Sequence, residues 1–181
     1  MLRKILKSGL RLLLGDYERY EIYSLPLKDL TAPDLARWTA QGFDFRPIQT
    51  DDLTRSPHQD IRAHAFYGGA GADGFGVFRN GELVSLQWYW HGDRYRQRNF
   101  WPLEHGEAKS VELFTLEDYR GQGIATALKA YSAYEMQKKG YTRLISRIWH
   151  SNSPSRRVSE KLGWSNIARV TVIYPFGIKA F

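Results

Sequence analysis

The alternation of apolar and polar residues predicts an antiparallel hairpin in the middle of the chain. Two strand-like runs in "GFGVFRNGELVSLQWYW" (74–90) flank the pair Asn80-Gly81, and an Asn-Gly pair supplies the positive φ angles that a type I′ turn requires. In the second arm one face carries Val84, Leu86, Trp88 and Trp90, and the other carries Ser85, Gln87 and Tyr89. The hairpin is therefore expected to cover part of an apolar core.

Further patterns predict that strands and helices follow one another along the rest of the chain. Period-two alternation predicts strands, and apolar residues at helical spacing predict helices. We expect strands over 17–25, 110–116, 141–149 and 167–176, and helices over 1–15, 30–41, 56–67, 123–139 and 153–162. Ser153 is expected to cap the last helix, and 92–108 is expected to be a loop or an irregular strand end. The strand–helix–strand unit from 111 to 149 predicts a parallel crossover in a mixed α/β domain.

The first fifteen residues form a pattern separate from the rest. On a helical wheel one side carries Leu2, Ile5, Leu6, Leu10 and Leu13, and the other carries Arg3, Lys4, Lys7 and Arg11. Such a helix can lie on anionic lipid, or it can pack on its own domain or on a partner subunit. The apolar run 12–14 is too short for a signal-peptide core or a membrane span. We therefore expect a cytoplasmic protein and leave open peripheral contact with the inner membrane surface through 1–14.

Composition restricts the domain organisation, the class of partner and the available side-chain chemistry. The chain has 181 residues and is 43% apolar, which fits one domain over 16–181 with a real core behind the helix of 1–15. The net charge of +7 favours an anionic partner, whether a phosphorylated ligand, nucleic acid or a membrane. No cysteine is present, which excludes disulfides, a thiolate nucleophile and cysteine-bound metal. The histidines lack metal-ligand spacing, and we predict no metal.

The stretch "DYRGQGIATAL" (118–128) places two glycines and an arginine just before a helical pattern. A helix start offers unpaired N–H groups and the positive end of the helix dipole. Gly121 and Gly123 let an anion approach the backbone closely, and Arg120 adds a permanent charge. The turn therefore predicts a phosphate cradle, with an ordinary tight turn and a surface arginine as the alternative.

Two spaced motifs together carry a family resemblance. The pattern Arg-x-x-Gly-x-Ala is filled by Arg120, Gly123 and Ala125, and "NSPSRRVSEKLGW" (152–164) follows it on a second helix. This arrangement resembles the GNAT superfamily of acyl-CoA-dependent N-acyltransferases, specifically over 110–165 and by element order over 16–109. The resemblance implies a central mixed β-sheet flanked by helices, and acetyl-CoA or another acyl-CoA as donor.

The resemblance also implies roles for individual residues. Backbone amides of 122, 123 and 125 would hold the pyrophosphate beside Arg120, and 113–115 would pair by main chain with the pantetheine arm. The implied coenzyme A residues are Leu113, Phe114, Thr115, Arg120, Gly121, Gln122, Gly123, Ile124, Ala125, Asn152, Ser155 and Arg156. One position departs from the family pattern, because Ser159 stands where many members carry a tyrosine that protonates the leaving thiolate.

Acylation of an amine also needs a base, and a carboxylate can remove the proton from an ammonium. Glu112 is the first candidate because it lies on the strand expected to carry the thioester, although a strand-face salt bridge is an alternative. Glu104 and His105 form a second candidate pair in the preceding loop. Acceptor-binding candidates are Tyr89, Trp90, Arg94 and Trp101, which suit a sugar, an aromatic amine or an apolar chain. Filling of the core is the alternative for the tryptophans.

The combined prediction is an N-acetyltransferase in which a small-molecule amine, such as an amino sugar or aromatic amine, attacks the bound thioester directly. A catalytically silent GNAT-like binding domain is one alternative. Another is a basic nucleic-acid-binding protein, because "DRYRQRNFW" (93–101) mixes basic and aromatic residues. The two spaced motifs have no role in that reading, so no nucleic-acid partner is expected. A homodimer is left open.

Overall fold

A computed structural model describes residues 16–96 and 101–174. The strands are β1 (Asp16–Pro26), β2 (Phe43–Pro47), β3 (Ala72–Arg79), β4 (Glu82–Trp90), β5 (Glu107–Thr115), β6 (Arg143–Trp149) and β7 (Ser165–Tyr174). The helices are α2 (Ala36–Ala40), α3 (Thr50–Thr54), α4 (Gln59–Ala63), α5 (Gly92–Arg96), α6 (Ile124–Lys138) and α7 (Ser153–Lys161), with 3₁₀ turns η1 (His64–Tyr67) and η2 (Glu117–Tyr119). The described strands form one mixed sheet in the order β2-β3-β4-β5-β6-β1-β7.

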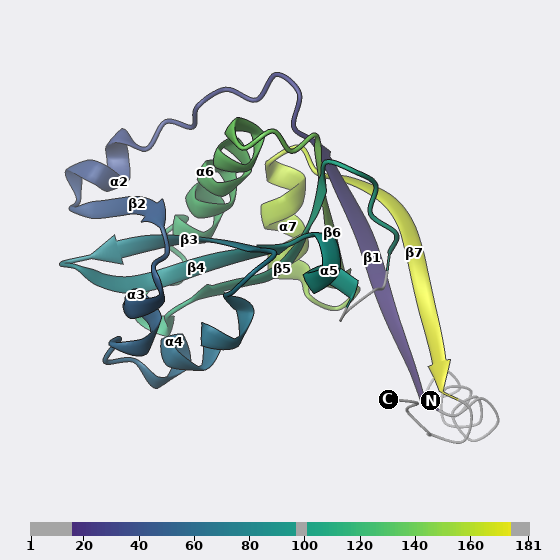
Figure 1. The fold of residues 1–181 in the computed structure, drawn as a ribbon, viewed down its shortest axis with the longest axis horizontal. Coiled ribbons are helices and arrows are strands. Elements are labelled where there is room, and N and C mark those ends of the chain that lie inside the picture. Colours follow the sequence, from purple (N-terminus) through teal and green to yellow (C-terminus); the bar gives the residue numbers. More distant parts are fainter. Residues whose placement is uncertain (1–15, 97–100, 175–181) are drawn as a thin grey trace, which may run out of the picture.

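Helices cover both faces of this sheet. Figure 1 shows α6 and α7 on one side and α3 and α4 on the other. The pair β3–β4 is antiparallel, and its turn has Asn80 at φ 51° and Gly81 at φ 81°, which confirms the predicted hairpin. Because the sheet is mixed and helix-flanked, the predicted α/β fold class is confirmed as well.

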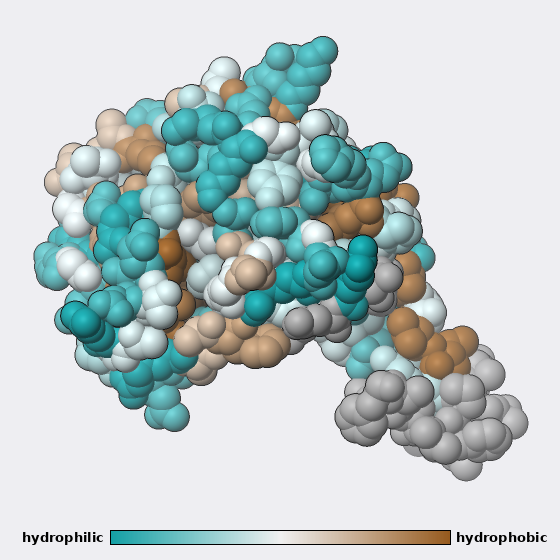
Figure 2. All heavy atoms as spheres, in the orientation of Figure 1, coloured by the Kyte–Doolittle hydropathy of each residue, from teal (hydrophilic) through white to brown (hydrophobic). Residues whose placement is uncertain are grey.

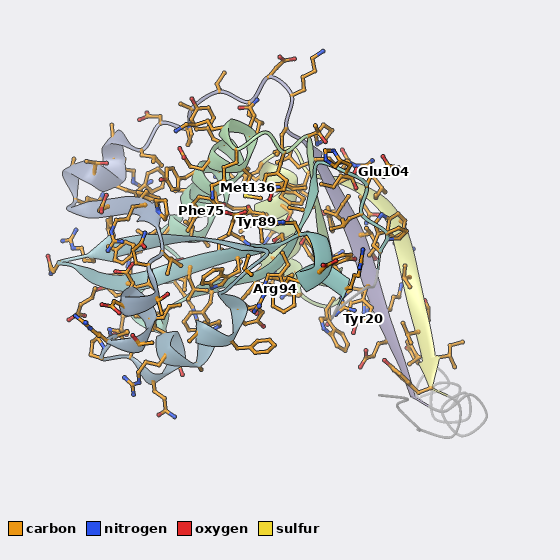
Figure 3. All side chains as sticks on the ribbon, in the orientation of Figure 1. Tyr20, Phe75, Tyr89, Arg94, Glu104 and Met136 are labelled. Atoms are coloured by element: carbon orange, nitrogen blue, oxygen red, sulfur yellow. The ribbon has the colours of Figure 1, made fainter. Side chains whose placement is uncertain are left out.

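The crossover at the centre of the fold is the part that positions the site. β5 and β6 run parallel and are joined by α6, as the sequence predicts, although β5 begins at Glu107, three residues early. The inner side of α6 buries Ile124, Leu128 and Met136. Figure 3 shows Met136 beside Phe75 and Tyr89 of the sheet, and the rings of Phe75 and Tyr89 lie 6.2 Å apart. This packing holds α6 against the sheet.

The first described strand lies far from its sequence neighbours in the sheet. β1 lies between β6 and β7 and is antiparallel to both. The β1–β7 ribbon extends beyond the body of the sheet in Figure 1, and Figure 2 shows apolar surface on it. Ile167 and Ile173 on the edge strand are 45% and 50% exposed. The alternation in 17–25 predicts the strand but not its place, because pairing partners are set by distant residues.

Several predicted elements differ in the structure. The helix expected over 30–41 is reduced to α2, which buries none of its residues; Pro33 restricts the residue before it and interrupts the pattern. The helix expected over 56–67 divides into α4 and η1, and β2 and α3 occur where no element was expected. Part of the segment 92–108 forms α5. Elements of five residues bury too few side chains to leave a periodic signal.

The N-cap of α7 differs from the prediction by one residue. Asn152, one residue before the predicted Ser153, is the N-cap, and its side chain accepts a hydrogen bond from the Ser155 amide at 3.2 Å. The predicted helix over 1–15 lies outside the described residues, so its contacts and the division at residue 15 stay predictions. Within the described ranges, no helix has the length and apolar character needed to cross a membrane.

Candidate functional site

The main opening in the sheet lies where β5 and β6 diverge. The two strands pair only from Glu107 opposite Arg143 to Ser110 opposite Ser146. Beyond Ser110, β5 continues to Thr115 and β6 to Trp149 without pairing to each other. A hollow of about 290 Å³, here called the strand gap, lies between them. Its lining comprises Lys109, Ser110, Val111, Glu112, Leu113, Lys129, Ser146, Arg147, Ile148, Trp149, Asn152 and Ser155.

A bulge in β5 produces this divergence. Trp88 pairs with Glu112 while its neighbour Tyr89 pairs with Ser110, so Val111 is an extra residue, and bulges of this kind bend the strand. The buried amide of Gln87 spans the bulge: Nε2 donates to the carbonyl oxygens of Trp88 at 2.9 Å and Glu112 at 2.6 Å. This bridge joins the backbone carbonyl groups of both strands at the bulge.

A second hollow lies at the start of α6. It measures about 400 Å³, is called the cradle here, and shares Leu113 and Ser155 with the strand gap. The other cradle residues are Thr115, Tyr119, Arg120, Gly121, Gly123, Ile124, Ala125, Thr126, Pro154 and Val158. The two hollows therefore form neighbouring parts of one channel from the helix start into the sheet.

The start of α6 is built to leave its amides open. Gly123 is the N-cap at φ 82° with no side-chain cap bond, so the first helical N–H groups lack an intrahelical partner. A Cβ at Gly121 would meet nothing within 4 Å, which shows open space above the turn. Arg120 is exposed, and its Nε donates to the Thr115 carbonyl at 2.9 Å. An anion can therefore reach bare amides beside a held cation, as a diphosphate requires.

Most of the predicted coenzyme A residues gather at these two hollows. Leu113, Thr115, Arg120, Gly121, Gly123, Ile124, Ala125 and Ser155 line the cradle, and Asn152 lines the strand gap. Phe114, Gln122 and Arg156 line neither hollow. The Phe114 ring instead packs against His64 with centroids 4.6 Å apart, and the Gln122 side chain donates to the Asp118 carbonyl.

The strand gap opens toward both faces of the sheet. Trp88 faces η1, because a Cβ on Gly68 would lie 3.3 Å from its ring. Tyr89 faces α6, since its hydroxyl lies 2.8 Å from that of Ser132. Glu112 pairs with Trp88, and paired residues share a face. The predicted base therefore lies on the η1 side of the gap, while Lys129 enters from α6.

Lys129 is a buried amine on the mainly apolar inner side of α6. It is 3% exposed, and its Nζ lies 2.6 Å from Ser159 Oγ and 4.2 Å from the Trp164 ring centre. Burial lowers the pKa of Lys129 to about 7. An amine with that pKa exchanges protons near neutral pH.

Lys109 is a second buried amine in the gap. It is 5% exposed, and its Nζ has no hydrogen-bond partner among the described residues. Burial and the nearby Arg147 guanidinium hold the pKa of Lys109 well below its usual value. It pairs with Trp90, whose indole donates to the Tyr67 carbonyl of η1, so Lys109 shares the face of Glu112.

Both lysines are absent from the sequence prediction. A usable signal was present for Lys129, which lies one turn after Ala125 on the face that a helix over 123–139 buries. A lysine at a core position lowers the stability of the fold unless its charge is paired, so such a position points to a function. Lys109 lies before the predicted strand start at Ser110, so its burial was not foreseeable.

The second pair of candidate catalytic bases, Glu104 and His105, lies away from the strand gap. Glu104 and His105 line a hollow of about 850 Å³ at the opposite end of β5, together with Asp73, His91 and Tyr141. Neither residue lines the strand gap or the cradle. The structure therefore does not bring this pair together with the Glu112 site.

The predicted acceptor residues are divided between the core and the η1 side. Tyr89 and Trp90 are completely buried, and burial raises the pKa of the Tyr89 phenol. Arg94 lies on the opposite side of the sheet from Tyr89 (Figure 3), with its guanidinium 4.7 Å from the Trp90 ring centre. Trp101 donates its backbone N–H to the Tyr95 hydroxyl at 2.8 Å. Trp90 therefore supports the surface that Arg94 presents.

No group of three or more histidine, aspartate or glutamate residues within 16–96 and 101–174 is arranged to hold a metal ion. The strand gap offers a carboxylate, two amines, a guanidinium, hydroxyl groups and main-chain groups. These groups suit proton transfer around an extended ligand.

Comparison with known proteins agrees with this geometry. The sequence profile of the Acetyltransferase (GNAT) family matches residues 34–164. No curated protein sequence matches the chain.

Solved structures share the fold at low identity. A GCN5-related N-acetyltransferase from Kribbella flavida is 15% identical, with a TM-score of 0.58 over 87% of this chain and 58% of its own. A tandem GNAT protein from the clavulanic acid biosynthesis pathway is 16% identical, with a TM-score of 0.61 over 96% of this chain and 59% of its own. This chain thus spans less than two thirds of either protein, and the likeness concerns the fold.

Proposed function

The chain belongs to the acetyltransferase (GNAT) family, and we propose that it transfers an acetyl group from acetyl-CoA to the amine of a small-molecule acceptor. One observation carries the proposal: the bulged, diverging strands open directly beside the uncapped start of α6. A long ligand with a diphosphate at one end and a thioester at the other fits that sequence of hollows.

The donor would be held mostly by backbone groups. The diphosphate would sit at the amides from Gly123 to Ala125, where the helix dipole favours negative charge, with Arg120 at its side. The unpaired edge of β5 at Leu113 and Thr115 would bind the pantetheine arm as an added strand does. Acetyl-CoA supplies an activated acyl group whose thiol, with a pKa of about 8.5, is a good leaving group.

The acceptor would approach from the η1 side. Glu112 would take a proton from the acceptor ammonium, directly or through one water, because only the neutral amine is nucleophilic. Arg94 and Trp149 lie on exposed or half-buried surface near this side, and an aromatic face suits an amino sugar or an aromatic amine. Tyr89 would contribute only as core support.

An acceptor screen tests this function. Purified full-length protein would be incubated with acetyl-CoA and a panel of amino sugars, aromatic amines, polyamines and amino acids, and free thiol would be measured over time. We expect acceptor-dependent thiol release that a variant with Arg120→Ala loses. Binding of coenzyme A without release for any amine class would favour a silent binding domain, and absence of coenzyme A binding would contradict the proposal.

A further inference from the structure

The two faces of the strand gap differ in what they offer to the leaving sulfur. The cradle and the strand gap share Leu113 and Ser155, so a ligand tail entering from the start of α6 arrives on the α6–α7 side. Glu112 and Lys109 lie on the η1 side of the gap, as their pairing with Trp88 and Trp90 shows. A donor to the sulfur is therefore expected on the α6–α7 side of the gap.

One titratable group of α6 lines that side of the strand gap. Lys129 is buried and lines the gap together with Asn152 and Ser155 of the α7 region. The residue of α7 that contacts Lys129 is Ser159. Its side chain is fully buried, and its hydroxyl is not an acid at neutral pH. The amine and the hydroxyl meet at 2.6 Å.

The hydrogen bonds around Ser159 fix the direction of this contact. The Ser159 hydroxyl donates to the Ser155 carbonyl at 3.0 Å, so its lone pairs accept from Lys129. An ammonium has three N–H groups. One of them is directed to Ser159, and the Trp164 ring lies 4.2 Å from Nζ. Ser159 thus holds the amine at the wall of the gap while leaving it hydrogens to give.

Resting on the proposed acetyl transfer, we propose that Lys129 is the general acid that protonates the departing thiolate of coenzyme A, and that Ser159 is its positioning residue. The acceptor nitrogen forms a bond to the thioester carbon, the carbon–sulfur bond breaks, and its electron pair stays on sulfur. A proton passes from the Lys129 ammonium to that sulfur, leaving a thiol and a neutral amine. The acceptor ammonium loses two protons in all. One of them restores the charge of Lys129, and the other is released to water.

The electrostatics of the gap support this assignment. Burial lowers the pKa of Lys129 to about 7, below the value of about 8.5 for a free thiol. The proton transfer to a thiolate is therefore downhill, and an acid with a pKa near the working pH is favourable. Glu112 on one side and Lys129 on the other would divide the two proton transfers between the two faces.

The test measures the bound product rather than turnover. Coenzyme A would be titrated into the full chain, and thiolate absorbance would be followed against pH for the wild type, Lys129→Met and Lys138→Met, an exposed lysine on the same helix. The thiol and amine share protons as a pair, and the amine is partly neutral where the thiol ionises, so the thiolate should appear at a pH about half a unit lower in the wild type than in Lys129→Met. Lys138→Met should behave as the wild type.

Each outcome decides the assignment. Equal thiol pKa values in wild-type and Lys129→Met complexes that bind coenzyme A tightly would overturn it and leave the proposed function standing. No binding by the wild type would overturn both. Should Lys129→Met not fold, Ser159→Ala and Lys129→Gln provide the same measurement, with a partial shift expected for Ser159→Ala. With an acceptor in hand, Lys129→Met should lower kcat roughly 100-fold with little change in KM.

Discussion

Gln87 lies across the bulge of β5, with its side-chain Nε2 2.6 Å from the carbonyl oxygen of Glu112. The same nitrogen lies 3.1 Å from Ser110 Oγ, so one amide joins both sides of the extra residue Val111. The bulge aims the remainder of β5 away from β6 and thereby opens the strand gap. The separation of the strands is thus set by one buried side chain of β4 in addition to the backbone.

This relationship predicts that Gln87→Leu weakens both fold and binding. The substitution keeps the volume roughly constant but leaves the carbonyl groups of Trp88 and Glu112 without this donor, at a cost of about 1–3 kcal/mol in the free energy of unfolding. We expect coenzyme A affinity to fall as well, because the β5 edge is no longer held open. Denaturant unfolding and calorimetric titration would measure the two effects; unchanged affinity would mean that the backbone alone sets the gap.

Glu112→Gln should change the pH profile of the reaction. At neutral pH a basic acceptor amine is protonated, with a pKa of about 8 to 10.4, so with such an acceptor loss of the base should lower the rate. At high pH the amine loses its proton to water and the rate should recover. Glu104→Gln, in the hollow at the other end of β5, provides the matched comparison. A profile altered by Glu104→Gln and not by Glu112→Gln would reverse the assignment of the base.

Lys129→Met should stabilise the protein in a pH-dependent way. The pKa of Lys129 is about 7 when folded and 10.5 ordinarily, so between these values the unfolded chain binds more protons and wild-type stability rises with pH. The cost of burial is complete below pH 7 and absent above about 10.5. At roughly 1.4 kcal/mol per pKa unit, a gain of about 3 kcal/mol is expected at pH 6 after the lost Ser159 contact.

That gain should shrink as the pH approaches 10. Guanidinium unfolding of both proteins at pH 6 and pH 10 would measure the difference. A gain of equal size at both pH values would show that Lys129 stays charged in the folded protein.

Gly74→Ala should disturb the acceptor side of the sheet. A Cβ at this position would lie 2.4 Å from the ring of Trp88, and the ring is buried on the η1 face beside Glu112. Overpacking of this kind costs roughly 1–3 kcal/mol. Thermal unfolding and the tryptophan fluorescence spectrum would detect the shift, with Gly81→Ala in the open hairpin turn as a comparison that strains φ without a clash. Equal spectra for wild type and Gly74→Ala would contradict the packing.

Local patterns in the sequence were sufficient for the central part of this fold. Asn80-Gly81 specifies its turn by its own φ preferences, and the run from Arg120 to Ala125 specifies a helix start with open amides. The order of the strands was not accessible, because the position of β1 between β6 and β7 depends on pairing across most of the chain. The short elements β2, α3 and α5 are fixed by tertiary packing, which overrides weak local preference.

The lining of the candidate site was likewise predictable where local motifs specify it and not where it depends on long-range packing. Gly123 and Leu113, chosen from the motifs and the family resemblance, do line the hollows, and their roles in binding stay predictions. Phe114 and Arg156 were also implied by the family resemblance, yet they line neither hollow, because side-chain direction depends on the bulge and on the turn of α7. Lys129 was missed since its partner Ser159 lies 30 residues away.

The central claim, a diphosphate held at the start of α6, is tested most directly by calorimetric titration with coenzyme A. Three proteins would be compared: the wild type, the double variant Arg120→Ala/Gly123→Ala, and Arg157→Ala as a control at an exposed position of α7. Circular dichroism would verify that each is folded. The account predicts that coenzyme A binds the wild type and Arg157→Ala with equal affinity. The double variant should bind it at least about 100-fold more weakly, or roughly 2.7 kcal/mol. Pantetheine, which lacks the diphosphate, should bind all three proteins weakly. Equal affinity of the folded double variant and the wild type for coenzyme A would contradict it.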